Sequence, residues 1–149
     1  MNGSTALARA SAPVNYQGAS EQAIQHHYDL SNEFYQLFLD SHMVYSSALW
    51  QAGDTLESAQ VRKIDFHINQ ARANGAKRVL DIGCGWGATL KRLVENHNVS
   101  SAIGLTLSQA QAEWTQAFEN SNIHVRLESW SDHSPEEPYP SVEKADGRP

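Results

Sequence analysis

A glycine-rich segment, Asp81-Ile82-Gly83-Cys84-Gly85-Trp86-Gly87, constrains the fold more than any other feature of the sequence. It overlaps the end of a short apolar run, Val79 to Ile82, which is typical of a buried parallel strand. Apolar residues at helical spacing follow it, at Leu90, Leu93 and Val94. A strand, a tight glycine turn and a helix in this order predict one unit of a parallel α/β sheet.

The same segment predicts a ligand. Gly83 and Gly85 can adopt positive φ and leave room against the backbone, and Gly87 lets the helix begin close to the strand. The spacing G-x-G-x-G differs from the dinucleotide fingerprint G-x-G-x-x-G. The acidic Asp81 suits a ligand with an ammonium group and no phosphate, so we predict that the loop binds S-adenosylmethionine (SAM). A tight turn whose glycines serve only packing is the alternative.

The region before this segment has the pattern of helices. Ser20 is a candidate cap for a helix that runs to His26. Ser31 or Asn32 can cap a second helix, whose apolar side chains recur at helical spacing at Phe34, Leu37 and Phe38. Thr55 begins a longer helix, with Leu56, Ile64, Ile68 and Ala71 near one face, which Asn74-Gly75 ends.

Two further strands are predicted after the glycine segment, at residues 102–105 and 123–127, with a helix capped by Ser108 between them. The order is therefore helices followed by β-α-β-α-β. The fold class is α/β: the N-terminal half of a doubly wound, Rossmann-like fold preceded by a helical segment, with the C-terminal strands missing.

These elements divide the chain into four parts. We predict a flexible lead-in over residues 1–19, a helical N-terminal cap over 20–74, a partial Rossmann-like SAM-binding domain over 75–131 and a disordered tail over 132–149. Four prolines and few apolar residues follow Ser131, where a doubly wound sheet should continue. Three strands with an open edge at the first or third would expose apolar surface, so we expect the chain to self-associate.

The composition narrows the class of protein. The chain has 149 residues and 40% hydrophobic residues, enough for one packed domain. A net charge of −6 argues against non-specific nucleic-acid binding. A single cysteine, the lack of an apolar run long enough for a membrane helix and the lack of a signal-like N-terminus favour a cytoplasmic protein. The scattered histidines have no ligand spacing, so we expect no metal site.

Other candidate ligand residues follow the second and third strands. Thr106 and Gln111 are polar groups near a position that often binds ribose, although Ser108 and Gln111 also match a capping box. Trp130 could stack on an adenine ring or pack in the core. We expect the other three tryptophans to be core residues and Cys84 to be a small loop residue rather than a nucleophile.

Together these motifs resemble the cyclopropane fatty acid synthases, especially the mycolic acid cyclopropane synthase and methyltransferase group. The resemblance spans about residues 24–138. The matching stretches are His27-Tyr28-Asp29-Leu30-Ser31-Asn32-Glu33-Phe34-Tyr35-Gln36-Leu37-Phe38-Leu39-Asp40, Tyr45-Ser46-Ser47-Ala48, Leu56-Glu57-Ser58-Ala59-Gln60, Leu80 to Gly87, and Gly104-Leu105-Thr106-Leu107-Ser108-Gln109-Ala110-Gln111.

The resemblance implies a class I SAM-dependent methyltransferase that acts on an unsaturated acyl lipid, with peripheral membrane contact a further option. It implies SAM contacts in the loop before the long helix, around the glycine segment and after the second and third strands. The residues are Tyr45, Ser46, Val79, Leu80, Asp81, Gly83, Cys84, Gly85, Trp86, Gly87, Thr106, Leu107, Gln111, Trp130 and Ser131.

The chemistry implied by the family is electrophilic. A lipid double bond attacks the sulfonium methyl, a carbocation forms, and loss of a proton closes a cyclopropane ring. A water-free pocket and aromatic faces would stabilise the cation. The resemblance also implies that a bound bicarbonate accepts the proton.

Two departures from the family limit this expectation. The family commonly has Tyr-Ser-Cys-Ala where this chain has Tyr45-Ser46-Ser47-Ala48, which puts the bicarbonate contact in doubt. After Tyr139 the expected apolar strand and a later Glu-His pair are replaced by residues 140–149, as in a frameshift or truncation. We therefore assign no catalytic residue. A catalytically silent SAM-binding or dimerisation module and a small-molecule methyltransferase of the same superfamily remain alternatives.

Overall fold

The computed structural model describes residues 31–139 and 141–144. The predicted lead-in over 1–19 and the predicted helix from Ser20 to His26 lie outside the described residues. None of the helices described is both long enough and apolar enough to cross a membrane. The elements are α2 Asn32–Gln36, α3 Leu56–Gln70, β1 Val79–Ile82, α4 Ala88–Asn96, β2 Ala102–Thr106, α5 Gln109–Gln116, β3 Ile123–Leu127 and β4 Ser141–Lys144.

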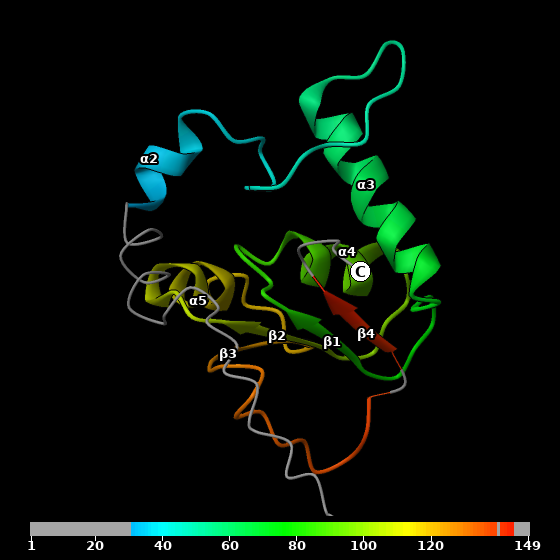
Figure 1. Cartoon of the computed structure of the whole chain (residues 1–149), viewed down its shortest axis with the longest axis vertical. Helices are drawn as coiled ribbons and strands as arrows, with labels where there is room; N and C mark the ends of the chain where they lie inside the picture. The colour runs from blue at the N-terminus through cyan, green and yellow to red at the C-terminus, as the bar shows by residue number, and fades with distance from the viewer. Residues whose placement is uncertain (1–30, 140, 145–149) are drawn as a thin grey trace, which may run out of the picture.

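The four strands form one parallel sheet in the order β3-β2-β1-β4 (Figure 1). Val79 lies opposite Ala102 on one side and Ser141 on the other, and Ala102 lies opposite Ile123. The chain moves outward from β1 to β3 and then returns to the other side of β1. This is the order in which a doubly wound sheet reverses direction, and it confirms the predicted α/β class.

Strand β4 corrects the interpretation of the C-terminal region. We predicted a disordered tail over 132–149, and this is wrong for Ser141–Lys144, which pair with β1 over its whole length. The predicted open edge at the first strand is wrong for the same reason, because β1 has neighbours on both sides. The sequence did not reveal β4 because its pairing energy comes from a preformed neighbour and not from its own apolar content. The described residues between β3 and β4 contain no helix.

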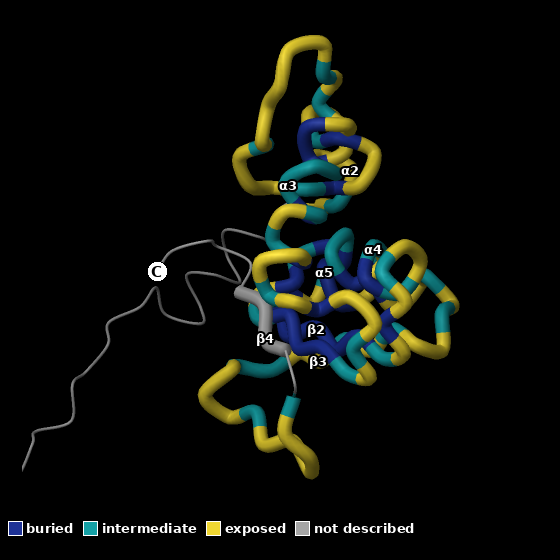
Figure 2. The backbone as a smooth tube through the Cα atoms, turned by 90° about the vertical axis from the view of Figure 1, so that its right-hand side faces the viewer, coloured by how far each residue is buried: buried dark blue, intermediate teal, exposed yellow. Residues whose placement is uncertain are grey.

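The two faces of the sheet have separate cores. Val79 and Ala102 point to the face covered by α3 and α4, where they pack with Ile64, Ile68 and Leu90. Figure 2 shows this buried centre beneath α4 and α5. The alternation along the strands follows from the two-residue period of β structure, which sends successive side chains to opposite faces.

The opposite face carries Leu80, Ile103 and Leu105, and the segment between β3 and β4 contributes Tyr139 to this cluster. The Arg78 guanidinium lies 4.7 Å from the centre of the Tyr139 ring. His133 Nε2 is 3.0 Å from the Tyr139 hydroxyl, and its other ring nitrogen contacts Glu128. These contacts fix a segment that contains no regular secondary structure against the sheet.

Helix α3 begins at the predicted cap, Thr55, and ends a few residues before the predicted Asn74-Gly75 stop. Thr55 caps it by accepting a hydrogen bond from the Ser58 amide, and the Ser58 hydroxyl returns one to the Thr55 backbone. The helix ends with Ala71 as its C-cap, before Asn74-Gly75, and Arg72 takes a positive φ of 54°. Asp65 binds the Arg92 guanidinium through both oxygens at 2.8 Å and joins α3 to α4.

Helix α2 is short, and the apolar side chains spaced at i, i+3 and i+4 are exposed. Ser31 caps it and Leu37 is already the C-cap. Phe34, Leu37 and Phe38 are 45%, 82% and 50% exposed, whereas Tyr35 is buried. The expected i, i+3, i+4 face is therefore exposed on the surface. Periodicity identified a real apolar stripe but not which side of the helix is buried.

Gly104 on β2 permits the closest packing in the core. A Cβ at this position would lie 2.6 Å from Cys84 Sγ and 2.6 Å from Leu90 Cδ1. The glycine loop and the first turn of α4 therefore lie directly on the backbone of β2. Gly104 lies within a strand predicted from the sequence, but the local pattern gives no sign of this packing role.

We predict that Gly104→Val destabilises the protein by about 1–3 kcal/mol, because the added carbons overlap two buried side chains that have no free space to move into. Urea unfolding followed by circular dichroism measures the change. Ser100→Ala, at an exposed position just before β2, is the control and should change the free energy of unfolding by less than about 0.5 kcal/mol. An equal effect of the two substitutions would contradict the role of Gly104.

Candidate cofactor site

The glycine loop is held over the end of β2 by its backbone. The amides of Gly83 and Cys84 both donate to the carbonyl oxygen of Leu105, at 2.9 and 3.0 Å. Gly83, Gly85 and Gly87 all take positive φ, at 80°, 56° and 82°. This backbone path favours glycine at all three positions. The loop therefore has one defined shape, set by glycine geometry and by hydrogen bonds to β2.

The glycines have different surroundings. A Cβ on Gly85 would have no atom within 4 Å, whereas one on Gly87 would lie 2.8 Å from Thr115 Cγ2 and 2.9 Å from Phe118 Cε2. Gly87 therefore allows close packing against α5 and the residues after it. Gly85 faces open space, which is the condition that a ligand lying against the backbone requires.

The Trp86 side chain points away from that open space. It is 2% exposed, its indole N–H donates to Asn32 Oδ1 at 2.8 Å, and its ring centre lies 4.6 Å from that of Tyr35. The prediction of a core tryptophan is confirmed at this position. Any ligand contact by Trp86 would therefore come from its backbone.

Asn32 is a residue of this site that the sequence analysis did not identify. Its Oδ1 accepts from Trp86 in the loop after β1, and its Nδ2 donates to the Ala110 carbonyl in the first turn of α5 at 3.4 Å. One carboxamide thus joins α2 to the loop after β1 and to the first turn of α5. The available signal was the position of Asn32 in a capping motif, which suggested only a local role.

Thr106 and Gln111 lie together at the end of β2. The Thr106 hydroxyl donates to Gln111 Oε1 at 2.7 Å, and both side chains are buried. Ser108 caps α5 by accepting from the Gln111 amide at 3.3 Å. The capping box is therefore only half formed, because the Gln111 side chain turns toward Thr106 and not back to Ser108. Leu107 is half-buried between them.

Tyr45 and Ser46 lie on an exposed loop before α3. The Tyr45 ring packs edge to face on Tyr35, with 5.5 Å between the ring centres. Gln60 Nε2 donates to the backbone carbonyls of Val44 and Ser46, at 3.3 and 2.8 Å. Lys63 Nζ donates to the Ser46 hydroxyl at 2.6 Å. Tyr35 thus links this loop to Trp86, and α3 holds it from the other side.

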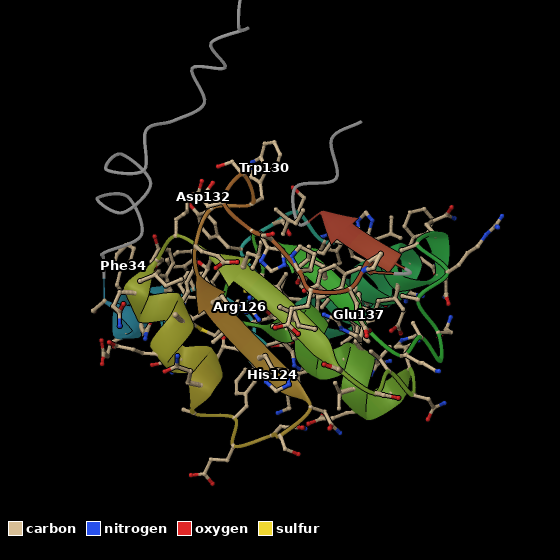
Figure 3. All side chains as sticks on the ribbon, turned by 90° about the horizontal axis from the view of Figure 1, so that it is seen from below. Phe34, His124, Arg126, Trp130, Asp132 and Glu137 are labelled. Carbon is tan, nitrogen blue, oxygen red and sulfur yellow. The ribbon has the colours of Figure 1, made fainter. Side chains whose placement is uncertain are left out.

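The remaining predicted residues are spread along the strands and beyond β3. Val79 and Leu80 are buried on opposite faces of the sheet, and Asp81 follows them, 1% exposed. Trp130 is 68% exposed, so the alternative of a core residue is wrong, and Ser131 is exposed beside it. Figure 3 shows Trp130 beyond the Arg126 end of β3, with His124 toward the other end.

Similarity to known protein families shows to which family the chain belongs. The family model described as mycolic acid cyclopropane synthetase matches residues 16–142. The chain belongs to this family. Cyclopropane mycolic acid synthase 3 of Mycobacterium tuberculosis is 42% identical over 113 residues, which cover 72% of this chain and 39% of that protein. The chain thus spans well under half the length of this relative.

Solved structures of the family agree with the fold. Mycolic acid cyclopropane synthase CmaA1 complexed with SAH and CTAB superposes with a TM-score of 0.78 at 37% identity, over 84% of this chain and 45% of that one. Cyclopropane synthase MmaA2 from Mycobacterium tuberculosis gives 0.77 at 37% identity, over 87% and 47%. The family resemblance expected from the sequence motifs is therefore confirmed.

Two titratable groups in this cyclopropane synthetase-family site have altered proton affinity. Burial raises the pKa of the Cys84 thiol, and the charge of Asp81 raises it further. Cys84 therefore stays a neutral thiol, as expected for a loop residue that is not a nucleophile. Burial lowers the pKa of Lys63 to about 8, and the charge of Asp40 opposes that shift.

Trp50, predicted to be a core residue, is 57% exposed, so that prediction is wrong.

We predict that Trp86→Phe loosens α2 without unfolding the sheet. The substitution keeps a ring beside Tyr35 but removes the hydrogen bond to Asn32, a loss of about 1 kcal/mol. Amide hydrogen exchange should become faster in residues 32–36 and stay unchanged in β1 and β2. Trp130→Phe, at an exposed position, is the matched control and should leave exchange in both regions unchanged. Uniformly faster exchange in Trp86→Phe would contradict this local role.

Proposed function

We propose that this chain carries the cofactor half of a SAM-dependent methyltransferase of the cyclopropane-synthase type, which transfers a methyl(ene) unit to the double bond of an unsaturated acyl lipid. The observation that carries the proposal is the open space over Gly85. This space lies at the carboxyl ends of the parallel strands β1 and β2, where the loops that follow them meet. SAH, named in the CmaA1 structure, is the demethylated product of SAM and supports the same cofactor here.

The residues of the site fit the chemistry of SAM. The Asp81 carboxylate suits the ammonium group, and the Thr106 and Gln111 side chains supply polar groups for ribose. The Gly83–Gly87 backbone leaves room for the ligand, and the exposed face of Trp130 suits stacking on adenine. The other proposed contacts are Tyr45, Ser46, Val79, Leu80, Cys84, Trp86, Leu107 and Ser131.

When bound, SAM supplies an electrophilic methyl group. Tyr35, Tyr45 and Trp86 form a connected aromatic wall. Tyr45 is its exposed ring, so Tyr45 is the member that would lie beside the cofactor and exclude water from one side. Aromatic faces stabilise nearby positive charge. Ser47, the described residue that the family resemblance links to bicarbonate, is exposed to solvent and does not form a fitting site, so no bicarbonate step is assigned.

A lipid substrate agrees with the surface of α2. Phe34, Leu37 and Phe38 present adjacent apolar side chains, and Phe34 and Phe38 stack edge to face at 5.5 Å. Such a stripe beside the aromatic wall suits an acyl chain or the surface of a bilayer. We include peripheral membrane contact in the proposal on this ground.

We predict that Gly85→Val weakens SAM binding by at least about tenfold, because the valine side chain would fill the open space that we assign to the ligand. Isothermal calorimetry with SAM and SAH measures the affinity. Gly53→Val is the matched control: Gly53 also has positive φ and an open Cβ position, but lies in the turn before α3. It should show similar backbone strain and unchanged affinity. Lack of SAM binding by the folded wild-type chain would refute the proposed function.

Catalysis is tested separately from binding. Mass spectrometry of an unsaturated phospholipid or acyl-carrier substrate after incubation with SAM should show a gain of one methylene unit. Intact SAM binding without this product would favour the silent binding module, and methylation of a small molecule would favour the other alternative.

We further propose that the chain self-associates through β3. This strand is one of the two edges of the described sheet, β4 being the other, and Leu127 at its end is 47% exposed. Light scattering at micromolar concentration should give a mass above that of one chain. Leu127→Lys, which replaces an exposed apolar side chain of the edge strand by a charge, should shift the protein toward monomer, whereas Arg126→Lys should not. A wild-type monomer at these concentrations would contradict the proposal.

A further inference from the structure

Lys63 occupies an unusual position beside the candidate site. It projects from the middle of α3, and its Nζ donates to the Ser46 hydroxyl at 2.6 Å and approaches the Ser46 carbonyl at 3.5 Å. Lys63 is half-buried. The charge of Asp40 raises the pKa of Lys63 and so opposes the effect of burial. The Asp40 carboxylate also accepts a hydrogen bond from the Val44 amide at 2.8 Å. A half-buried lysine is costly to keep charged unless a partner or a ligand interacts with the charge.

The shape of the loop does not require Lys63. Gln60, one turn earlier on α3, already binds the carbonyls of Val44 and Ser46, and Asp40 binds the Val44 amide. The backbone of residues 44–46 is therefore held by three hydrogen bonds that do not involve Lys63. What Lys63 adds is a positive charge next to the Ser46 hydroxyl. Because Ser46 Oγ accepts from Lys63, its own proton is available to a ligand.

The charges of SAM divide between the two sides of the site. Near neutral pH the amino-acid end of SAM carries an ammonium group and one carboxylate, which is the sole anionic group of the molecule. Asp81, in β1, suits the ammonium group and would repel the carboxylate. The carboxylate therefore needs a cationic or hydrogen-bond-donating partner elsewhere, and Ser46 is a cofactor contact in the proposed function.

We propose that Lys63 and the Ser46 hydroxyl together form the subsite that recognises the carboxylate of SAM, with Lys63 as its counter-charge. This inference rests on the proposed function and adds to it a specificity element on α3. In this proposal the helical cap recognises the carboxylate of SAM. The sheet and the loops that follow its strands recognise the ammonium group, the ribose and the adenine.

The test compares SAM with its decarboxylated analogue, S-adenosylmethioninamine, which keeps the adenosine, the sulfonium and the amine. Calorimetry on the full chain should show that wild type binds SAM at least about tenfold more tightly than the analogue, as expected for a charge-assisted hydrogen bond. Lys63→Met should lose most of the affinity for SAM and little for the analogue. Lys91→Met, at an exposed position on α4, is the control and should change neither.

A second measurement does not depend on the folding of Lys63→Met. Wild-type affinity for SAM should fall as pH rises through about 8, because Lys63 loses its proton there. Lys63→Arg keeps its charge, so its affinity should fall less over the same range, which separates Lys63 from the titration of the ligand amine.

Three results would overturn the inference. These are equal affinity of wild type for SAM and the analogue, equal weakening of both ligands by Lys63→Met, or identical pH profiles for wild type and Lys63→Arg. Each leaves SAM binding by wild type intact, and so leaves the proposed function standing. Absence of SAM binding by the wild-type chain would instead refute the proposed function and this inference with it.

Discussion

Two hydrogen bonds to one carbonyl oxygen, that of Leu105, fix the geometry on which the candidate site depends. They place Gly83 and Cys84 over the end of β2, and the missing side chain of Gly104 allows Cys84 and Leu90 to approach the strand closely enough for those bonds to form. The start of α4 is set by the same contact. The open space at Gly85 is thus a consequence of packing beneath it, because a loop lifted from β2 would lose its defined path.

The helical cap is joined to this loop by a few specific contacts. Asn32 bonds to both Trp86 and Ala110, and Tyr35 lies between Trp86 and Tyr45. Polar bonds of this kind fix orientation while contributing only modest net stability, since each replaces a bond to water. The connection is therefore strongly directional although it buries few side chains. The position of α2 relative to the loops rests on these few side chains, whereas α3 shares one of the two cores of the sheet.

Local patterns in the sequence predicted the parts of the fold that local physics determines. Thr55 and Ser108 cap their helices because their hydroxyls reach the next turn, and the glycine loop follows from its positive φ angles. Contacts made across the sheet were not predictable in this way. Strand β4 pairs because β1 is present, and α2 exposes its apolar stripe because Tyr35 packs on Trp86. In the site, Thr106 and Gln111 were identified as ligand candidates, but Asn32, Gln60 and Lys63 act through partners far away in the sequence.

The division of the site between cap and sheet has a consequence for its stability. A ligand that contacts both Ser46 and the loops after β1 and β2 binds only when the cap is docked, so it must favour the docked arrangement by its binding free energy. The Thr106–Gln111 bond and the fixed glycine loop prepare one half of the site in advance. The other half depends on an exposed loop held from α3. The cofactor would therefore complete the connection between the helical cap and the sheet that Asn32 and Tyr35 begin.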